Sequence, residues 1–258
     1  MRRFPWLLSI LLVNPDGSGP YPTIQSAINA AVDGDEVHLA EGGFYGPGNR
    51  DMDLQGKTII IKGIGSNASS IWTHEDGRLH RAFTFKSNEG PDTRIENVSF
   101  FGGETDSLGI ICILDSSPTL LDCTFLSIAN ICVFNMGGSP LIEGCAFYEN
   151  GISIRSIGGY IKIEHTWIQD NWANGGGVVR IDSGYIENSN LMGNEDYALT
   201  VTPGGSDCVM VINTEVYYQA IQTLPGACVR ILKEKHADDF APLSLSPLSW
   251  AAIKVKYR

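Results

Sequence analysis

The hydrophobic positions of this chain recur with a period of 21 to 25 residues. Six segments of eight residues align without gaps: their third position is always aliphatic, their sixth is small, and their eighth is large and apolar. A fixed repeat of this length indicates a solenoid, in which each repeat buries its apolar face against its neighbours. The six segments are 93–100, 118–125, 140–147, 161–168, 184–191 and 209–216.

The inward positions change phase within each segment. Positions six and eight lie on the same face of a strand, but position three is one residue out of step with them. A strand keeps its phase unless it bends, so we expect a corner near positions four and five. Position five is mostly Asn, Asp or Gly, which tolerate the left-handed backbone of a sharp bend, and such side chains could hydrogen-bond along the axis. The residues at position five are Asn97, Asp122, Gly144, His165, Asn188 and Asn213.

A second alternating apolar run accompanies each repeat, with loops rich in Gly, Ser and Pro between the runs. No period holds an apolar pattern of 3.6 residues that is long enough for a helix. The sequence therefore predicts an all-β fold, a parallel β-helix of about eight to nine rungs over residues 36–232. The second runs are 82–85, 110–113, 131–134, 152–154, 178–181, 198–201 and 228–231.

The two ends of the chain differ from the repeats. Residues 22–33 place apolar side chains on one face and begin next to Thr23, a good N-cap, which predicts a helix. Because a solenoid exposes an apolar end, we expect residues 14–35 to form a turn and an N-terminal capping α-helix. Residues 1–13 are either a secretory signal peptide or a first strand, since two arginines precede a short apolar run. Residues 233–258 are expected to form a C-terminal tail.

One long segment carries a family resemblance. NPDGSGPYPTIQSAINAAVDGDEVHLAEGGFYGPGNRDMDLQGKTIIIKG, together with the eight-residue segments, resembles bacterial right-handed parallel β-helix repeat proteins of the pectin-lyase-like superfamily. The resemblance extends over residues 12–232 and implies a right-handed β-helix. It does not define one function, because this superfamily contains lyases, hydrolases, esterases, adhesins and non-catalytic surface proteins.

The motifs of the superfamily's enzymes are largely missing. Residues 16–28 are similar to the opening of pectin methylesterases, but the segments that supply the aspartates, glutamine and arginine of those enzymes are absent. The N-T-D, G-H-G and R-I-K signatures of polygalacturonases are absent as well. Pectate lyases hold calcium with an acidic cluster that leaves a weaker sequence trace, so this activity stays open. We assign no catalytic residue from the sequence.

Composition narrows the classes of partner. The 258 residues include 29 Asp and Glu against 18 Lys and Arg, a net charge of -11, and 43% of them are hydrophobic. Such a hydrophobic fraction excludes a mostly disordered chain. The acidic balance argues against nucleic acid and against an anionic membrane surface, because both attract basic faces. The apolar run near the N-terminus is too short to span a bilayer. We expect no nucleic-acid partner and no membrane span.

Position four of the segments forms an acidic column of Glu96, Glu143, Glu164 and Glu187. Glu143, Glu164 and Glu187 lie on consecutive rungs, where a strand spacing of about 4.8 Å would bring their carboxylates together. Like charges at this spacing repel unless a cation binds or water screens them, so the column is a candidate calcium site. The alternative is a solvated edge whose charge is relieved by Lys162 and Arg94.

The loop at residues 72–80 (WTHEDGRLH) interrupts the regular rungs. Rigid scaffolds usually carry their function on such excursions. An aromatic ring beside charged hydrogen-bonding groups could engage a saccharide, and the alternative is a solvated insertion without a ligand. We expect Trp167 and Trp172 to be packing residues. The candidate ligand-binding residues of the loop are Trp72, His74, Glu75, Asp76, Arg78 and His80.

The six cysteines form three pairs whose members are about one rung apart. The inward sixth position predicts that Cys123 and Cys145 are buried thiols. Cys112 and Cys132 lie between inward residues and are the better disulfide candidates if the compartment is oxidising. The spacings do not match a metal finger. The pairs are Cys112 and Cys132, Cys123 and Cys145, and Cys208 and Cys228.

These observations favour a secreted or cell-surface, non-catalytic β-helix protein that contacts polysaccharide or another surface. One alternative is a divergent polysaccharide lyase or glycoside hydrolase that acts on acidic polysaccharide. A second is a structural spacer in a larger surface assembly. An acidic protein repels a polyanionic substrate unless calcium or a local basic groove intervenes, which favours the non-enzyme. The sequence makes no prediction about the oligomeric state.

Overall fold

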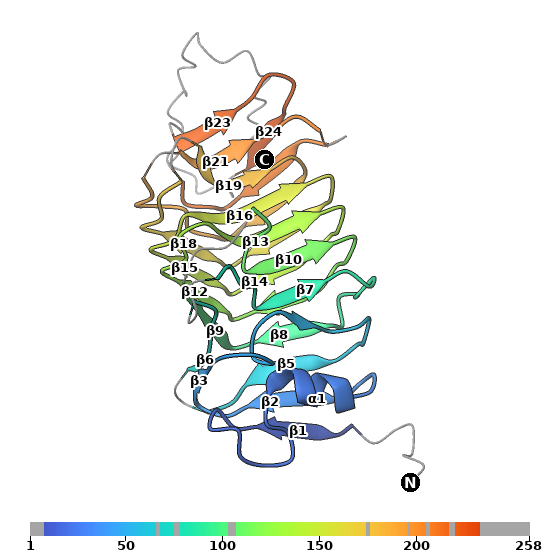
Figure 1. The fold of residues 1–258 in the computed structure, drawn as a ribbon. Helices are drawn as coiled ribbons and strands as arrows, with labels where there is room; N and C mark the ends of the chain where they lie inside the picture. The colour runs from blue at the N-terminus through green and yellow to red at the C-terminus, as the bar shows by residue number, and fades with distance from the viewer. Residues whose placement is uncertain are drawn as a thin grey trace.

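Three parallel β-sheets wind into a solenoid of about nine turns, whose strands stack one above another (Figure 1). The computed structural model describes residues 8–65, 68–74, 78–102, 107–173, 176–195, 197–204, 207–216 and 220–232. Neighbouring strands pair in parallel in all three sheets. The predicted all-β parallel β-helix is therefore confirmed in the part of the chain that the structure describes.

Each regular turn adds one strand to each sheet. The ten-stranded sheet contains β1 (Ile10–Val13), β2 (Glu36–Leu39), β5 (Ile60–Gly63), β8 (Arg94–Glu96), β11 (Thr119–Leu121), β14 (Leu141–Glu143), β17 (Ile161–Glu164), β20 (Gly184–Glu187), β22 (Val209–Ile212) and β24 (Val229–Leu232). The eight-stranded sheet contains β4 (Met52–Asp53), β7 (Phe83–Phe85), β10 (Ile111–Leu114), β13 (Ile131–Met136), β16 (Ile152–Ile157), β19 (Gly177–Ile181), β21 (Tyr197–Val201) and β23 (Ile221–Thr223). The six-stranded sheet contains β3 (Gly42–Phe44), β6 (Ser69–Trp72), β9 (Val98–Phe101), β12 (Thr124–Leu126), β15 (Ala146–Tyr148) and β18 (Trp167–Gln169).

The corner predicted at position five is confirmed in all six segments. The residue there leaves the ten-stranded sheet with a positive φ, which reverses the phase of the inward side chains. The φ values are 51° at Asn97, 53° at Asp122, 63° at Gly144, 50° at His165, 48° at Asn188 and 45° at Asn213.

A ladder of asparagines follows the next corner, after the six-stranded sheet, and two of its three members, Asn150 and Asn171, are buried. Asn150 Nδ2 donates to Asn171 Oδ1, and Asn171 Nδ2 donates to Asn194 Oδ1, each at 3.0 Å. The same amides also donate to backbone carbonyls of neighbouring rungs. This ladder satisfies polar groups inside a corner that water does not reach.

The predicted inward columns form the core. Positions three and six are buried in every segment, and position eight is buried in the first five. Phe100, Phe125 and Phe147 stack along the axis with ring centroids 4.9 and 4.5 Å apart. Because each rung adds one side chain to each column, the same apolar residue types recur at the same positions.

A short helix, α1 (Ile24–Ala30), packs at the N-terminal end of the eight-stranded sheet (Figure 1). Thr23 is its N-cap as predicted, and the side chains of Thr23 and Ser26 form a reciprocal capping box. The Gln25 amide accepts from the backbone N–H of Asp53 and donates to its carbonyl, so the helix satisfies backbone groups of β4. The helix is shorter than the predicted 22–33 because Ala31 is already extended, with ψ of 152°.

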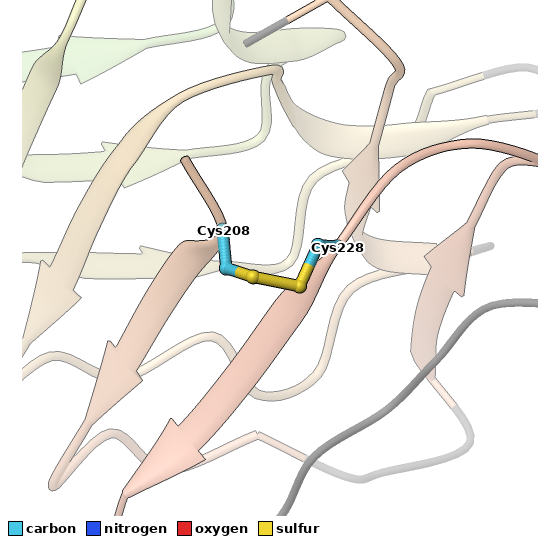
Figure 2. The surroundings of a disulfide bond; sticks show 2 residues. All are labelled: Cys208 and Cys228. Atoms are coloured by element: carbon cyan, nitrogen blue, oxygen red, sulfur yellow. A yellow bond between two sulfur atoms is a disulfide. The ribbon is translucent and has the colours of Figure 1, made fainter. Parts of the chain in front are cut away.

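The disulfide joins the one cysteine pair for which the sequence made no separate prediction. Cys208 and Cys228, just before β22 and β24, are bonded with Cα atoms 4.5 Å apart (Figure 2). Cys123 and Cys145 are buried thiols, as predicted.

The expectation of a disulfide between Cys112 and Cys132 is wrong, since both side chains are buried and neither forms a disulfide. The register pairs Cys112 with Phe134, two residues beyond Cys132, so the two thiols do not face each other.

The run at 228–231 also differs from its prediction, because β24 pairs with β22 and joins the ten-stranded sheet.

Candidate functional site

The acidic column lies on the outer face of the ten-stranded sheet. The register pairs Glu143 with Glu164 and Glu164 with Glu187, so these carboxylates stand on consecutive rungs. One ligand atom each of Glu143, Glu164 and His165 lies within 4.8 Å of the others. Calcium takes about six to eight oxygen ligands, so these three groups would supply only a part of its shell.

A tyrosine joins this cluster from the next rung. The Tyr185 hydroxyl donates to Glu164 Oε1. Burial, and after it this hydrogen bond to a carboxylate, raises the pKa of Tyr185 well above its ordinary value. The phenol therefore remains a proton donor to Glu164 at neutral pH. The outer face thus combines two carboxylates, an imidazole and a neutral phenol.

Of the two expected cations, Arg94 lies near a carboxylate of the column, that of Glu96, and Lys62, which was not predicted, lies closer to the same carboxylate. Glu96 lies 3.0 Å from Lys62 and 3.7 Å from Arg94. The Glu96 carboxylate is the principal cause that raises the pKa of Lys62. Among the described residues, no ion pair joins Lys162 to Glu143 or Glu164.

Trp72 is held inside an aromatic stack on the outer face of the six-stranded sheet. Its ring lies 4.7 Å from Phe101 at an interplanar angle of 10°, and 5.7 Å from Tyr45 at 25°. His74 packs against it with centroids 5.4 Å apart. Because Tyr45 and Phe101 stack along the axis on either side of the indole, Trp72 has little free ring face to offer to a ligand.

The other candidates from loop 72–80 do not gather into one cluster with Trp72. Arg78 is exposed, and His80 Nδ1 lies within hydrogen-bond distance of Asp51 Oδ2, at the corner that precedes β4. Glu75 and Asp76 lie outside the described residues. Of the six candidates, the structure therefore brings together Trp72 and His74.

The outer face of the six-stranded sheet carries no charged side chain on any of its strands, all of which the structure describes in full. Each strand presents one or two outward residues to solvent beside a buried inward residue. The outward residues are Gly43, Ser70, Trp72, Ser99, Phe101, Thr124, Leu126, Ala146, Tyr148, Trp167 and Gln169.

Trp167 is the exposed aromatic residue of this face. Its side chain is 51% exposed, so the expectation that it is a packing residue is wrong. The register sets it beside Ala146, which has too little side chain to cover an indole. The alternation of the segment could have found it, because position seven lies between the inward positions six and eight.

One comparison with known protein families agrees with this fold. Residues 108–217 match the family model described as right handed beta helix region. Together with the parallel sheets, this match is consistent with a right-handed parallel β-helix of the pectin-lyase-like superfamily.

A solved structure, ORF18 of Geobacillus virus E2, is similar with a TM-score of 0.43 and 12% identity, over 96% of this chain. The chain spans 61% of the length of that viral protein. No curated protein matches the sequence. Within the described residues, no helix has the length and apolar character needed to cross a membrane.

Proposed function

We propose that this protein is a secreted or cell-surface, non-catalytic β-helix protein that binds polysaccharide on the outer face of its six-stranded sheet. One observation carries the proposal: this face presents aromatic rings, hydroxyls and amides without a charged side chain on its strands. Sugars are recognised by the same groups, since their hydroxyls hydrogen-bond and their C–H faces pack on aromatic rings.

The disulfide supports the proposed location outside the cytoplasm. Disulfides persist in oxidising compartments and are rare in reducing ones. The Cys208–Cys228 bond joins two consecutive strands of the ten-stranded sheet near the C-terminal end of the solenoid. Its formation in the native protein would agree with export.

The test is incubation of the full chain with a panel of acidic and neutral polysaccharides, with and without calcium. Binding is measured by affinity electrophoresis, and turnover by unsaturated products and new reducing ends. We expect binding to at least one polysaccharide and no turnover. A protein that binds none of them would contradict the proposal and would favour a structural spacer.

A second candidate function is a divergent polysaccharide lyase or glycoside hydrolase acting on acidic polysaccharide. It is favoured by the cluster of Glu143, Glu164 and His165, with Tyr185 bonded to Glu164. Carboxylates can hold calcium or act as acid and base, and a phenol can donate a proton. This reading requires that Glu164→Gln abolishes product formation, while Glu36→Gln at the N-terminal end of the same sheet does not.

A further inference from the structure

We propose that the six-stranded sheet binds a neutral, linear polysaccharide whose chain runs along the solenoid axis and stacks on Trp167. This inference rests on the proposed function and adds to it the class of ligand, its direction and its principal contact. Its parts follow from the charge of the face, the stacking of its small residues, and the free ring of Trp167.

The charges around the face exclude a polyanionic ligand. The strands themselves contribute no charge, and the residues at the following corner of the last two rungs are Glu149 and Asp170. Asp122 occupies the corner that precedes β12. These carboxylates repel an acidic polymer, whereas a neutral one carries no charge for them to repel.

A strip of small residues gives the direction of the ligand. The register aligns Ser70, Ser99, Thr124 and Ala146 on successive rungs, next to the larger side chains of the same strands. Adjacent strands lie about 4.8 Å apart, so the six strands extend over about 24 Å along the axis. Across the axis, by contrast, each strand offers at most two outward positions. A repeating polymer therefore finds repeated contacts only along the axis.

The strip contains unused hydrogen-bonding groups. Ser70 accepts from the Trp72 indole and donates to the Gly42 carbonyl, so its hydroxyl is already engaged. The hydroxyls of Ser99 and Thr124 have no protein partner within the described residues. Each offers one donor and two acceptor positions, which suits the hydroxyl groups of a neutral sugar.

Trp167, on the last strand of the sheet, offers the strip an open aromatic surface, and a single parallel bridge sets Asn190 on its other side. Within the described residues its ring contacts no other aromatic ring, and Ala146 leaves space beside it. Trp72, at the other end of the same sheet, is covered by Tyr45 and Phe101. An indole with a free face can pack against the C–H groups of a sugar ring, so Trp167 is the stacking contact.

The composition of the strip favours a glycan over a second protein as occupant. Before Trp167, the strip consists of Ser70, Ser99, Thr124 and Ala146, with no large apolar side chain. The larger outward residues lie in the neighbouring column, where Trp72 already stacks on Tyr45 and Phe101. The core of a protein interface is more apolar than this strip and is rich in large anchors. A strip of serine, threonine and alanine beside one exposed indole fits a hydroxylated ligand better.

The experiment measures the affinity of the full chain for neutral linear glucans, mannans and galactans, and for polygalacturonate and alginate. We expect binding to a neutral polymer that is insensitive to salt and to calcium. Trp167→Ala should lower this affinity about tenfold or more, and Thr124→Val should lower it several-fold. Tyr197→Ala, an exposed aromatic residue of the eight-stranded sheet, is the matched control and should leave it unchanged.

The outcomes separate this inference from the proposed function. Binding to acidic polymers alone would overturn the neutral ligand but leave polysaccharide binding intact. Neutral binding that Trp167→Ala and Thr124→Val both leave unchanged would overturn the strip as the site. Binding to no polysaccharide would overturn both proposals. Circular dichroism checks that each variant is folded, and Thr124→Val decides the question if Trp167→Ala does not fold.

Discussion

The N-terminal and C-terminal halves of the solenoid share the same inner columns but differ in how their outward side chains are partnered. In the N-terminal half, Trp72 lies between Tyr45 and Phe101, and Glu96 lies 3.0 Å from Lys62. In the C-terminal half, Trp167 is half exposed. There Glu164 is close to another carboxylate and no lysine or arginine pairs with it among the described residues.

The two ends of the solenoid also differ in how their outermost strands are held. At the N-terminal end, α1 satisfies backbone groups of β4 through the Gln25 amide. Near the C-terminal end, a covalent bond between Cys208 and Cys228 holds β22 and β24 together. Non-covalent contacts complete the N-terminal half. A covalent cross-link stabilises the C-terminal half, where polar and aromatic side chains lie open to solvent. The open groups of the C-terminal half are therefore the place to look for ligands.

The largest expected effect comes from removing the covalent cross-link. The Cys208→Ser/Cys228→Ser variant should lose about 3 kcal/mol of unfolding free energy, because the bond closes a loop of 20 residues. Urea unfolding measures the loss, and hydrogen exchange should show that the amides of β24 open first. Counting thiols in denaturant without reductant should find four, matching the free cysteines. A count of six would contradict the cross-link.

The next test compares the two tryptophans of the six-stranded sheet. Trp72→Ala removes a ring from between two others and should cost about 2 kcal/mol of unfolding free energy. Trp167→Ala removes an exposed side chain and should change stability by less than about 0.5 kcal/mol. Equal losses of stability in the two variants would show that Trp167 is packed like Trp72.

Two substitutions in the acidic column, one in each half of the solenoid, should change the free energy of unfolding in opposite directions. Glu96→Gln removes the partner of Lys62 and should lower the unfolding free energy by about 0.5 kcal/mol. Glu143→Gln relieves repulsion with Glu164, leaves the hydrogen bond from Tyr185 to Glu164 in place, and should raise it by about 0.3 kcal/mol. Urea midpoints at low ionic strength measure both. Changes of the same sign in both variants would contradict the proposed difference between the two halves. Added salt should make both changes in unfolding free energy smaller.

The smallest effect concerns Tyr185 and pH. Its raised pKa in the folded state means that the neutral phenol contributes stability below its ordinary pKa and that this contribution is lost as the pH rises above about 10. The wild type should therefore exceed Tyr185→Phe in stability at neutral pH, and the difference should shrink in alkali. Urea midpoints at several pH values measure it. A difference that is constant with pH would mean that the hydrogen bond to Glu164 does not contribute.

The sequence determined the fold because each rung repeats one local rule. The alternation and phase shift of the eight-residue segments predicted the inward columns, and the prevalence of Asn, Asp and Gly at position five predicted the left-handed corners. Thr23 likewise predicted the start of α1. These features depend on contacts within a few residues, or on stacking between equivalent positions, and both are visible in a repeat.

The tertiary structure alone decided which neighbours meet across rungs of unequal length. A shift of two positions between β10 and β13 set Cys112 opposite Phe134 rather than opposite Cys132. The small residue Ala146, opposite Trp167, left that indole open, while Phe101 covered Trp72. Residue type does not report such pairings, because loop lengths set the register and the register selects the partner. The fold could therefore be predicted from the repeat, whereas the open strip required the stacked rungs themselves.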